Sequence, residues 1–197
     1  MGGVKGLPYD AAIEYLESNG SQWIEIDSVR YDANNSYRIE CGVMNLFSDS
    51  RYNGWDAGGA FGFMDSKFTN GDGGSFGPRS VDTYADITLV INSGSSTQSN
   101  MTVIVNSDSY SNSRAHGSLG TYASNKGYHL FAMYSRNSIT DKTSERIYYC
   151  KLYINDSLVC DLIPVRVGTT GYMYDKISGN LFGNAGTGNF ILGPDKT

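Results

Sequence analysis

Hydrophobic and polar side chains alternate along many short segments of this chain, and this two-residue period constrains the fold more than any other feature. In residues 37–43 the hydrophobic positions are Tyr37, Ile39, Cys41 and Val43, with polar residues or glycine between them. Successive side chains of a β-strand point to opposite faces, so each such segment is expected to bury one face. The other segments with this pattern are 24–27, 87–91 and 101–105.

Two runs, residues 128–134 and 147–154, are hydrophobic on both faces. They predict central strands that have the core on one side and a loop or second layer on the other. Within the first run, His129 alternates with its hydrophobic neighbours and is expected to be packed or half-buried.

Turn residues separate most of these segments. Asn155 and Asp156 stand between the run 147–154 and residues 158–163, which predicts a β-hairpin. Pro164 is expected to end the second arm, because proline has no N–H for a ladder. A first strand is expected over residues 13–18, and the longest helix expected is one of one or two turns near 175–178.

About a dozen short strands without a helical layer predict an all-β fold, a two-sheet antiparallel β-sandwich. A sandwich of 197 residues usually forms one domain around one core. We therefore expect a single domain over residues 1–197, with residues 1–10 as an N-terminal arm or linker.

Two stretches, residues 49–83 and 107–126, lack strand periodicity except at residues 60–64. The first is rich in glycine and aromatic residues, and the second in serine, asparagine and glycine. The rest of both stretches is expected to form large loops. Loops on a rigid scaffold often carry the function of a domain.

The composition argues against two classes of partner. The formal net charge is −5, and lysine and arginine form no cluster of the kind that tracks nucleic-acid phosphates. No stretch approaches the roughly 20 apolar residues that cross a bilayer, so no membrane insertion is expected. The first residues contain no apolar segment of the kind found in signal peptides, so this chain as it stands shows no signal peptide.

The three cysteines do not form a disulfide framework, because their number is odd. Cys150 and Cys160 lie on opposite arms of the expected hairpin, so a bridge between them is one alternative. The favoured alternative is that the cysteines are buried free thiols. His116 and His129 are not at metal-ligand spacing from any cysteine, so no metal site is expected there.

Two regions resemble a known family. Residues 14–24 resemble the opening of laminin-G-like, concanavalin A-like domains found in gut bacterial surface proteins and phage structural proteins. The tail is similar to the ending of the same domains, in residues 146–153, 161–166, 171–175, 179–184 and 186–188. The resemblance implies a jelly roll of two stacked sheets, with the first and last strands adjacent. As a class of function, it implies carbohydrate or protein recognition.

Some relatives of this fold hydrolyse β-glucans with a strand that carries Glu-x-Asp-x-x-Glu. This chain has Glu25 and Asp27 at the first two positions, but Arg30 stands at the third. The acid/base carboxylate is therefore missing, and we expect no enzymatic activity.

Sugar binding by such a domain needs aromatic rings and planar polar groups close together. Residues 49–56 supply Tyr52, Trp55 and Asp56, and residues 70–79 supply Asn70, Asp72 and Arg79. These six residues are the predicted ligand-binding set. The alternative for Trp55 is that it covers the edge of the core. Calcium is a further candidate ligand for the Asp and Asn oxygens of these segments, but structural water with ordinary Asx-turns is the favoured explanation, and no cofactor is predicted.

The sequence therefore leads to a first hypothesis and two alternatives. The first is a non-catalytic, lectin-like carbohydrate-recognition domain of a bacterial surface or phage protein. Such a domain would bind a glycan or cell-surface polysaccharide, and it would be extracellular, at the cell surface or on a virion. The second is a structural or protein-interaction module of a virion or adhesin, with other protein subunits as partners. The third, a glycoside hydrolase, is remote.

Overall fold

The computed structural model of the chain describes most of its residues: 6–32, 34–46, 52–56, 60–64, 68–71, 75–76, 82–92, 98–115, 123–135, 138–140 and 142–197. Within these ranges every regular element is a β-strand, and the strands form two sheets that are antiparallel apart from the pairing of β5 with β13. The all-β prediction is confirmed for this part of the chain.

The larger sheet is built around three long central strands, β9 (Tyr84–Asn92), β4 (Tyr37–Asn45) and β15 (Ser144–Ile154). On one side of this trio lie β10 (Gln98–Val105) and β11 (Asp108–Ala115). On the other side lie β16 (Ser157–Val167), β17 (Thr170–Asp175) and β18 (Leu181–Phe182). Three short strands complete the sheet: β1 (Ala11–Ala12), β2 (Leu16–Asn19) and β19 (Ile191–Leu192).

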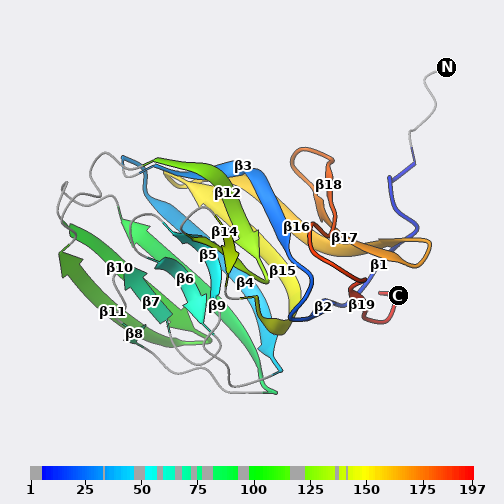
Figure 1. The fold of residues 1–197 in the computed structure, drawn as a ribbon, viewed down its shortest axis with the longest axis horizontal. Helices are drawn as coiled ribbons and strands as arrows, with labels where there is room; N and C mark the ends of the chain where they lie inside the picture. Colours follow the sequence, from blue (N-terminus) through cyan, green and yellow to red (C-terminus); the bar gives the residue numbers. More distant parts are fainter. Residues whose placement is uncertain are drawn as a thin grey trace.

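The smaller sheet joins segments between Ile24 and Thr140. Its main path is β14 (Ser138–Thr140), β13 (Met133–Ser135), β5 (Tyr52–Asp56), β6 (Ala60–Met64), β7 (Phe68–Gly71) and β8 (Ser75–Phe76). Strand β12 (Ala123–Leu130) links β5 to β3 (Ile24–Asp32). In Figure 1, β12, β5 and β6 overlie β15, β4 and β9 of the larger sheet.

One hydrophobic core receives side chains from both sheets. The alternating positions Ile39 and Leu89 of the larger sheet are at most 1% exposed, and Ile26 and Leu130 of the smaller sheet are fully buried in the same cluster. Burying a side chain of this size contributes roughly 1.5–3 kcal/mol. Two antiparallel sheets around a shared core are consistent with a β-sandwich.

The predicted hairpin is confirmed. Strands β15 and β16 are joined by Asn155 and Asp156, whose φ angles are 49° and 63°. Positive φ at both central residues is the requirement of a type I′ turn, which asparagine and aspartate tolerate better than most residues. The Asn155 Oδ1 also accepts a hydrogen bond from the Ser36 backbone N–H at 2.9 Å, which ties the turn to the loop before β4.

The prediction that Pro164 ends the second arm is wrong. Strand β16 continues through Pro164 to Val167, pairing with β17 on one side and with β1 on the other. What ends near Pro164 is the ladder to β15, whose last pair is Cys150 with Leu162. A proline is tolerated where β16 changes neighbours, because no β15 ladder bond is lost there.

The expected large loops also need correction. Residues 52–56 form strand β5, and residues 107–126 contain β11 and the start of β12. The predicted strand at residues 60–64 is confirmed as β6. Conversely, the expected strand over 128–134 is broken at Phe131, whose φ is 65°. The expected short helix near 175–178 is a turn.

The expected first strand over 13–18 is only partly right. The extended residues there are β1, a single bridge at Ile13, and β2. The last strand, β19, pairs with β2, whereas the first strand, β1, pairs with β16.

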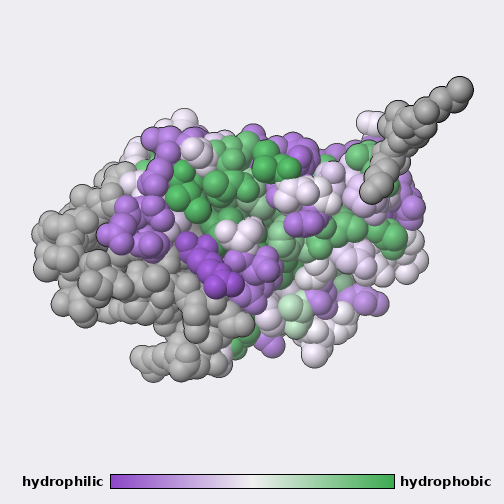
Figure 2. Space-filling view, turned by 90° about the horizontal axis from the view of Figure 1, so that it is seen from above, coloured by the Kyte–Doolittle hydropathy of each residue, from purple (hydrophilic) through white to green (hydrophobic). Residues whose placement is uncertain are grey.

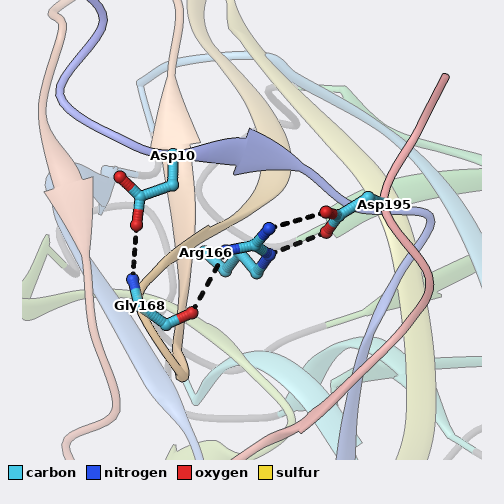
Figure 3. A network of polar contacts seen from close by, with 4 residues as sticks. All are labelled: Asp10, Arg166, Gly168 and Asp195. Atoms are coloured by element: carbon cyan, nitrogen blue, oxygen red, sulfur yellow. Dashed lines mark hydrogen bonds and ion pairs between the residues drawn. The ribbon is translucent and has the colours of Figure 1, made fainter.

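Both end segments of the chain are held on β16 (Figure 3). Asp10 accepts a hydrogen bond from the Gly168 N–H at 2.6 Å. Arg166 donates to both carboxylate oxygens of Asp195, at 2.7 and 2.6 Å. Such a two-point arginine–carboxylate pair fixes the relative orientation of the two side chains in addition to holding them together by charge. Within the expected N-terminal arm, residues 9–10 therefore already pack on the fold, and the Tyr9 ring meets the Tyr174 ring at 5.0 Å.

Candidate functional site

The outer face of the larger sheet carries a group of tyrosines around a β-bulge in β15. The register between β15 and β4 shifts between Ile147 and Tyr149. Ile147 and Cys150 are buried in the core, so Tyr148 and Tyr149 both lie on the outer side and are half-buried. Bulges often re-aim side chains in this way. We call the group Tyr15, Tyr84, Asp86, Arg146, Tyr148 and Tyr149 the tyrosine face.

Gly42 of β4 provides the space for two of these rings. A Cβ atom built on Gly42 would lie 2.7 Å from the Tyr149 Cε1 and 2.7 Å from the Tyr84 hydroxyl oxygen. Gly42 pairs with Tyr149 on one side and with Asp86 on the other. The missing side chain therefore lets the Tyr149 ring lie flat over β4 and reach β9.

Asp86 joins the two tyrosines at this position. The Tyr84 hydroxyl donates to the Asp86 Oδ1 at 2.5 Å, and the Tyr149 hydroxyl donates to the same oxygen at 2.9 Å. Burial, followed by the hydrogen bond to Asp86, raises the pKa of both phenols above the ordinary value. Both hydroxyls thus remain protonated donors throughout the neutral range.

The face continues across the sheet through ring contacts. The Tyr148 ring meets Tyr84 edge-on at 5.0 Å and Tyr15 at 5.4 Å. The Arg146 guanidinium lies 4.5 Å from the centre of the Tyr15 ring and donates to the Glu17 carboxylate at 2.6 Å. Edge-on aromatic pairs and a cation over a ring are both favourable arrangements, so the rings are held in place.

A second contact between a guanidinium group and an aromatic ring lies further along β4 and β15. The Arg38 guanidinium sits 3.5 Å from the centre of the Tyr153 ring, and Arg38 is ion-paired with Glu40. The Tyr153 hydroxyl donates to Glu40 at 3.2 Å. In both clusters, therefore, a guanidinium group contacts an aromatic ring and a carboxylate.

This arrangement can bind a flat polar ligand. Rigid aromatic rings offer apolar surface, while phenol, guanidinium and carboxylate groups offer donors and acceptors at fixed places. Tyr84 is 39% exposed, the largest value among the face's tyrosines. The other exposed large hydrophobic residues in the described ranges lie outside the tyrosine face: Leu158 and Val167 on β16, Ile191 on β19, and Leu7 and Ile177 outside the strands. From above, the described surface likewise shows hydrophobic areas interleaved with hydrophilic ones (Figure 2).

A cleft lies beside β3, where the β17–β18 turn approaches it (Figure 1). This open cleft of about 460 Å³ is lined by Glu25, Asp27, residues 180–183 and Ala185. Glu25 accepts a hydrogen bond from the Gly127 N–H at 3.1 Å, so one of its oxygens supports the sheet. Arg30, at the third position of the glucanase-like motif, donates to the Asp27 backbone oxygen at 3.2 Å.

The far wall of this cleft is organised by a buried carboxylate. Asp175 is 2% exposed and accepts hydrogen bonds from the backbone N–H groups of Asp161, Ile177 and Ser178 and from the Ser178 hydroxyl, at 2.6–3.1 Å. Burial alone would raise the pKa of Asp175, but these donors outweigh it and lower the pKa below the ordinary value. The turn that presents residues 180–183 therefore depends on an ionised Asp175.

The structure places four of the six predicted ligand-binding residues on strands. Tyr52, Trp55 and Asp56 belong to β5, and Asn70 belongs to β7. The register pairs Trp55 with Phe61 and Phe61 with Asn70, so Trp55 and Asn70 occupy one row across β5, β6 and β7. Asp72 and Arg79 lie outside the described residues.

Sequence reasoning missed the tyrosine face, although a signal for it exists. Ile147 and Cys150 both face inward at a spacing of three, which breaks strict alternation and marks a bulge. The outer face of β15 was expected to lie under a loop or second layer, whereas Tyr148 and Tyr149 are only half-buried. His129 is confirmed as packed: it is fully buried, and its ring lies 5.5 Å from that of Trp23.

Searches of family models, curated proteins and solved structures found no match to this chain. The described residues contain no group of three or more His, Cys, Asp or Glu arranged to hold a metal ion. In the same part of the chain no helix is long and apolar enough to cross a bilayer. Among the described residues, the tyrosine face is the surface on which we base a functional proposal.

Proposed function

We propose that this chain is a non-catalytic carbohydrate-recognition domain that binds a glycan on the tyrosine face. One observation carries the proposal: Tyr15, Tyr84, Tyr148 and Tyr149 form a connected, partly exposed aromatic surface that is bracketed by Asp86 and Arg146. Aromatic rings cover the apolar face of a pyranose, and the flanking polar groups take its hydroxyls.

The charge of the face favours a neutral sugar. Arg146 is paired with Glu17, whereas the exposed Asp86 carries a negative charge and accepts two phenolic hydrogen bonds. An acidic glycan would meet repulsion at Asp86, and sugar hydroxyls are good donors to a carboxylate.

The concanavalin A-like jelly-roll assignment belongs to the same proposal. It is supported by the two antiparallel sheets around one core and by the pairing of β2 with β19. Domains of that class on bacterial surfaces and phage particles act outside the cell, so we propose the same location for this domain. Catalysis is not part of the proposal, because the motif around Glu25 and Asp27 has Arg30 in place of its acid/base.

A glycan array tests the proposal with four proteins: the wild type, Tyr84→Ala, Tyr148→Ala and Trp55→Ala. We expect the wild type to bind neutral glycans. Loss of an aromatic contact in a binding site typically costs about 1–3 kcal/mol, so each tyrosine variant should bind about 5-fold to 150-fold more weakly, while Trp55→Ala binds like the wild type. Circular dichroism confirms that each variant is folded.

Two results would overturn this assignment. Binding that survives both tyrosine substitutions but not Trp55→Ala would move the site to β5, where the sequence predicted it. Absence of binding to any glycan, together with capture of a defined protein subunit that Tyr84→Ala abolishes, would make the face a protein-interaction surface instead. Tyrosine and arginine are also the residues that such surfaces favour.

A further inference from the structure

The three cysteines lie on three adjacent strands, and the register makes two of them direct partners. Cys41 of β4 pairs with Cys150 of β15. Cys160 of β16 pairs with Leu152, and Cys150 pairs with Leu162 on that side. The hairpin therefore offsets Cys150 from Cys160 by two residues, and the bridge considered between these two has no direct register.

The geometry of Cys41 and Cys150 suits a covalent bond. Directly paired residues of antiparallel strands have Cα atoms about 4.5 or 5.5 Å apart, within the 4.4–6.8 Å that disulfides span. The two sulfur atoms, here as free thiols, lie 2.6 Å apart. Both side chains are fully buried, so they point from neighbouring strands into the same part of the core.

We propose that Cys41 and Cys150 form a disulfide when the chain folds in an oxidising compartment, and that Cys160 stays a free thiol. The bond joins β4 to β15 and closes a loop between residues 109 positions apart in sequence. It lies on the core side of the sheet beneath Gly42 and Tyr149, which neighbour the two cysteines along their strands. The proposal does not depend on the glycan-binding proposal.

The chemistry needs a thiol oxidant, for which a small-molecule disulfide such as oxidised glutathione is sufficient. One cysteine thiolate attacks a glutathione sulfur, which forms a mixed disulfide and releases one glutathione thiolate. The second cysteine thiolate then attacks the protein sulfur of the mixed disulfide and releases the second glutathione. The two cysteines lose two protons and two electrons in total, and one oxidised glutathione becomes two reduced ones.

The burial of the two thiols determines when the disulfide can form. In the folded chain neither sulfur is reachable by solvent, and burial raises the pKa of Cys150, with a further rise from the contact with Cys41. A buried, protonated thiol is a poor nucleophile. The exchange must therefore take place during folding, and folded reduced protein should resist oxidised glutathione.

Trypsin can identify the bridge, because the chain has cleavable residues between all three cysteines. Cleavage after Arg38, Arg51, Arg146, Lys151 and Arg166 places Cys41 in residues 39–51, Cys150 in 147–151 and Cys160 in 152–166. The reduced, unfolded protein is refolded in a glutathione redox buffer, its free thiols are alkylated, and the digest is analysed without reduction. We expect peptides 39–51 and 147–151 to be linked, peptide 152–166 to be alkylated, and the intact protein to be about 2 Da lighter than its reduced form.

Cys160→Ser is the matched control, because it removes the third thiol and should leave the link intact, whereas Cys150→Ser should abolish it. A second preparation, exported to a bacterial periplasm where thiol oxidants act during folding, gives the same answer without refolding. A link between 147–151 and 152–166, or three alkylated cysteines in both preparations of folded protein, would overturn the proposal.

Discussion

The Tyr149 hydroxyl donates a hydrogen bond to the Asp86 carboxylate at 2.9 Å, across the intervening strand β4. The two residues are 63 positions apart in the sequence. Their contact depends on Gly42, because any side chain on that residue would fill the space that the Tyr149 ring occupies. Three strands therefore contribute to one binding feature: a ring from β15, a carboxylate from β9 and a gap from β4.

Substituting Gly42→Ala should displace both tyrosine rings. The added methyl group would lie 2.7 Å from the Tyr149 ring, closer than real Cβ contacts allow. We expect a loss of about 1–3 kcal/mol in the free energy of unfolding, as for other overpacked sites. Urea denaturation measures this, and a glycan array should show weakened binding. Gly6→Ala is the matched control, because its Cβ would meet nothing within 4 Å; equal stability of both variants would contradict this explanation of Gly42.

The β15–β16 turn gives a separate test of backbone strain. Asn155 combines a φ of 49° with side-chain hydrogen bonds to the Ser36 N–H and the Asn35 side chain, at 2.9 and 2.8 Å. Asn155→Ala loses the bonds and strains the backbone, whereas Asn155→Gly loses the bonds alone. We expect Asn155→Ala to destabilise the fold by about 1–3 kcal/mol and Asn155→Gly by clearly less, as measured by thermal unfolding. The reverse order would show that the turn is not strained.

Acid should destabilise the fold partly through Asp175. Its pKa is lowered in the folded state, so its carboxylate stabilises the fold above the unfolded pKa of about 4, and this contribution disappears as the pH falls through the folded value. Asp175→Asn should cost about 1–3 kcal/mol at pH 7 and should lose less stability than the wild type on acidification. Urea denaturation between about pH 7 and pH 2 measures the difference.

The control for this pH effect is Asp195→Asn. Asp195 also has a lowered pKa, caused first by its hydrogen bonds with Arg166, but that pair is exposed and screened by solvent. Its substitution should change the acid dependence much less than Asp175→Asn does. A wild-type and an Asp175→Asn protein with the same acid dependence would rule out Asp175 as a source of the effect.

The proposed Cys41–Cys150 bond should stabilise the fold measurably. Closing a loop of this length is expected to contribute about 2–5 kcal/mol by restricting the unfolded chain. Adding dithiothreitol during urea unfolding should therefore lower the midpoint for the wild type and for Cys160→Ser. It should have no effect on Cys41→Ser, and a midpoint independent of dithiothreitol in all three would count against the bond.

The local pattern of the sequence was enough to predict the strands that line the core. Ile39, Leu89 and Leu130 are buried because alternation in an amphipathic strand leaves one face for the interior. The Asn155–Asp156 turn was equally readable, since only a few residue types tolerate the positive φ that it requires. Strands β5 and β11 were expected to be loops, because their polar and glycine-rich sequences lack the alternation that a buried face imposes.

The tyrosine face and the cysteine pair were decided by tertiary structure alone. Sequence reasoning placed candidate ligand residues at Trp55 and Asn70, and the register does set these in one row, but it could not connect Tyr149 with Asp86 or Cys41 with Cys150. Alternation is a property of neighbouring residues, whereas strand pairing joins residues far apart in the chain. A single bulge at Tyr148 then shifts the register, and that shift determines which side chains share the outer face.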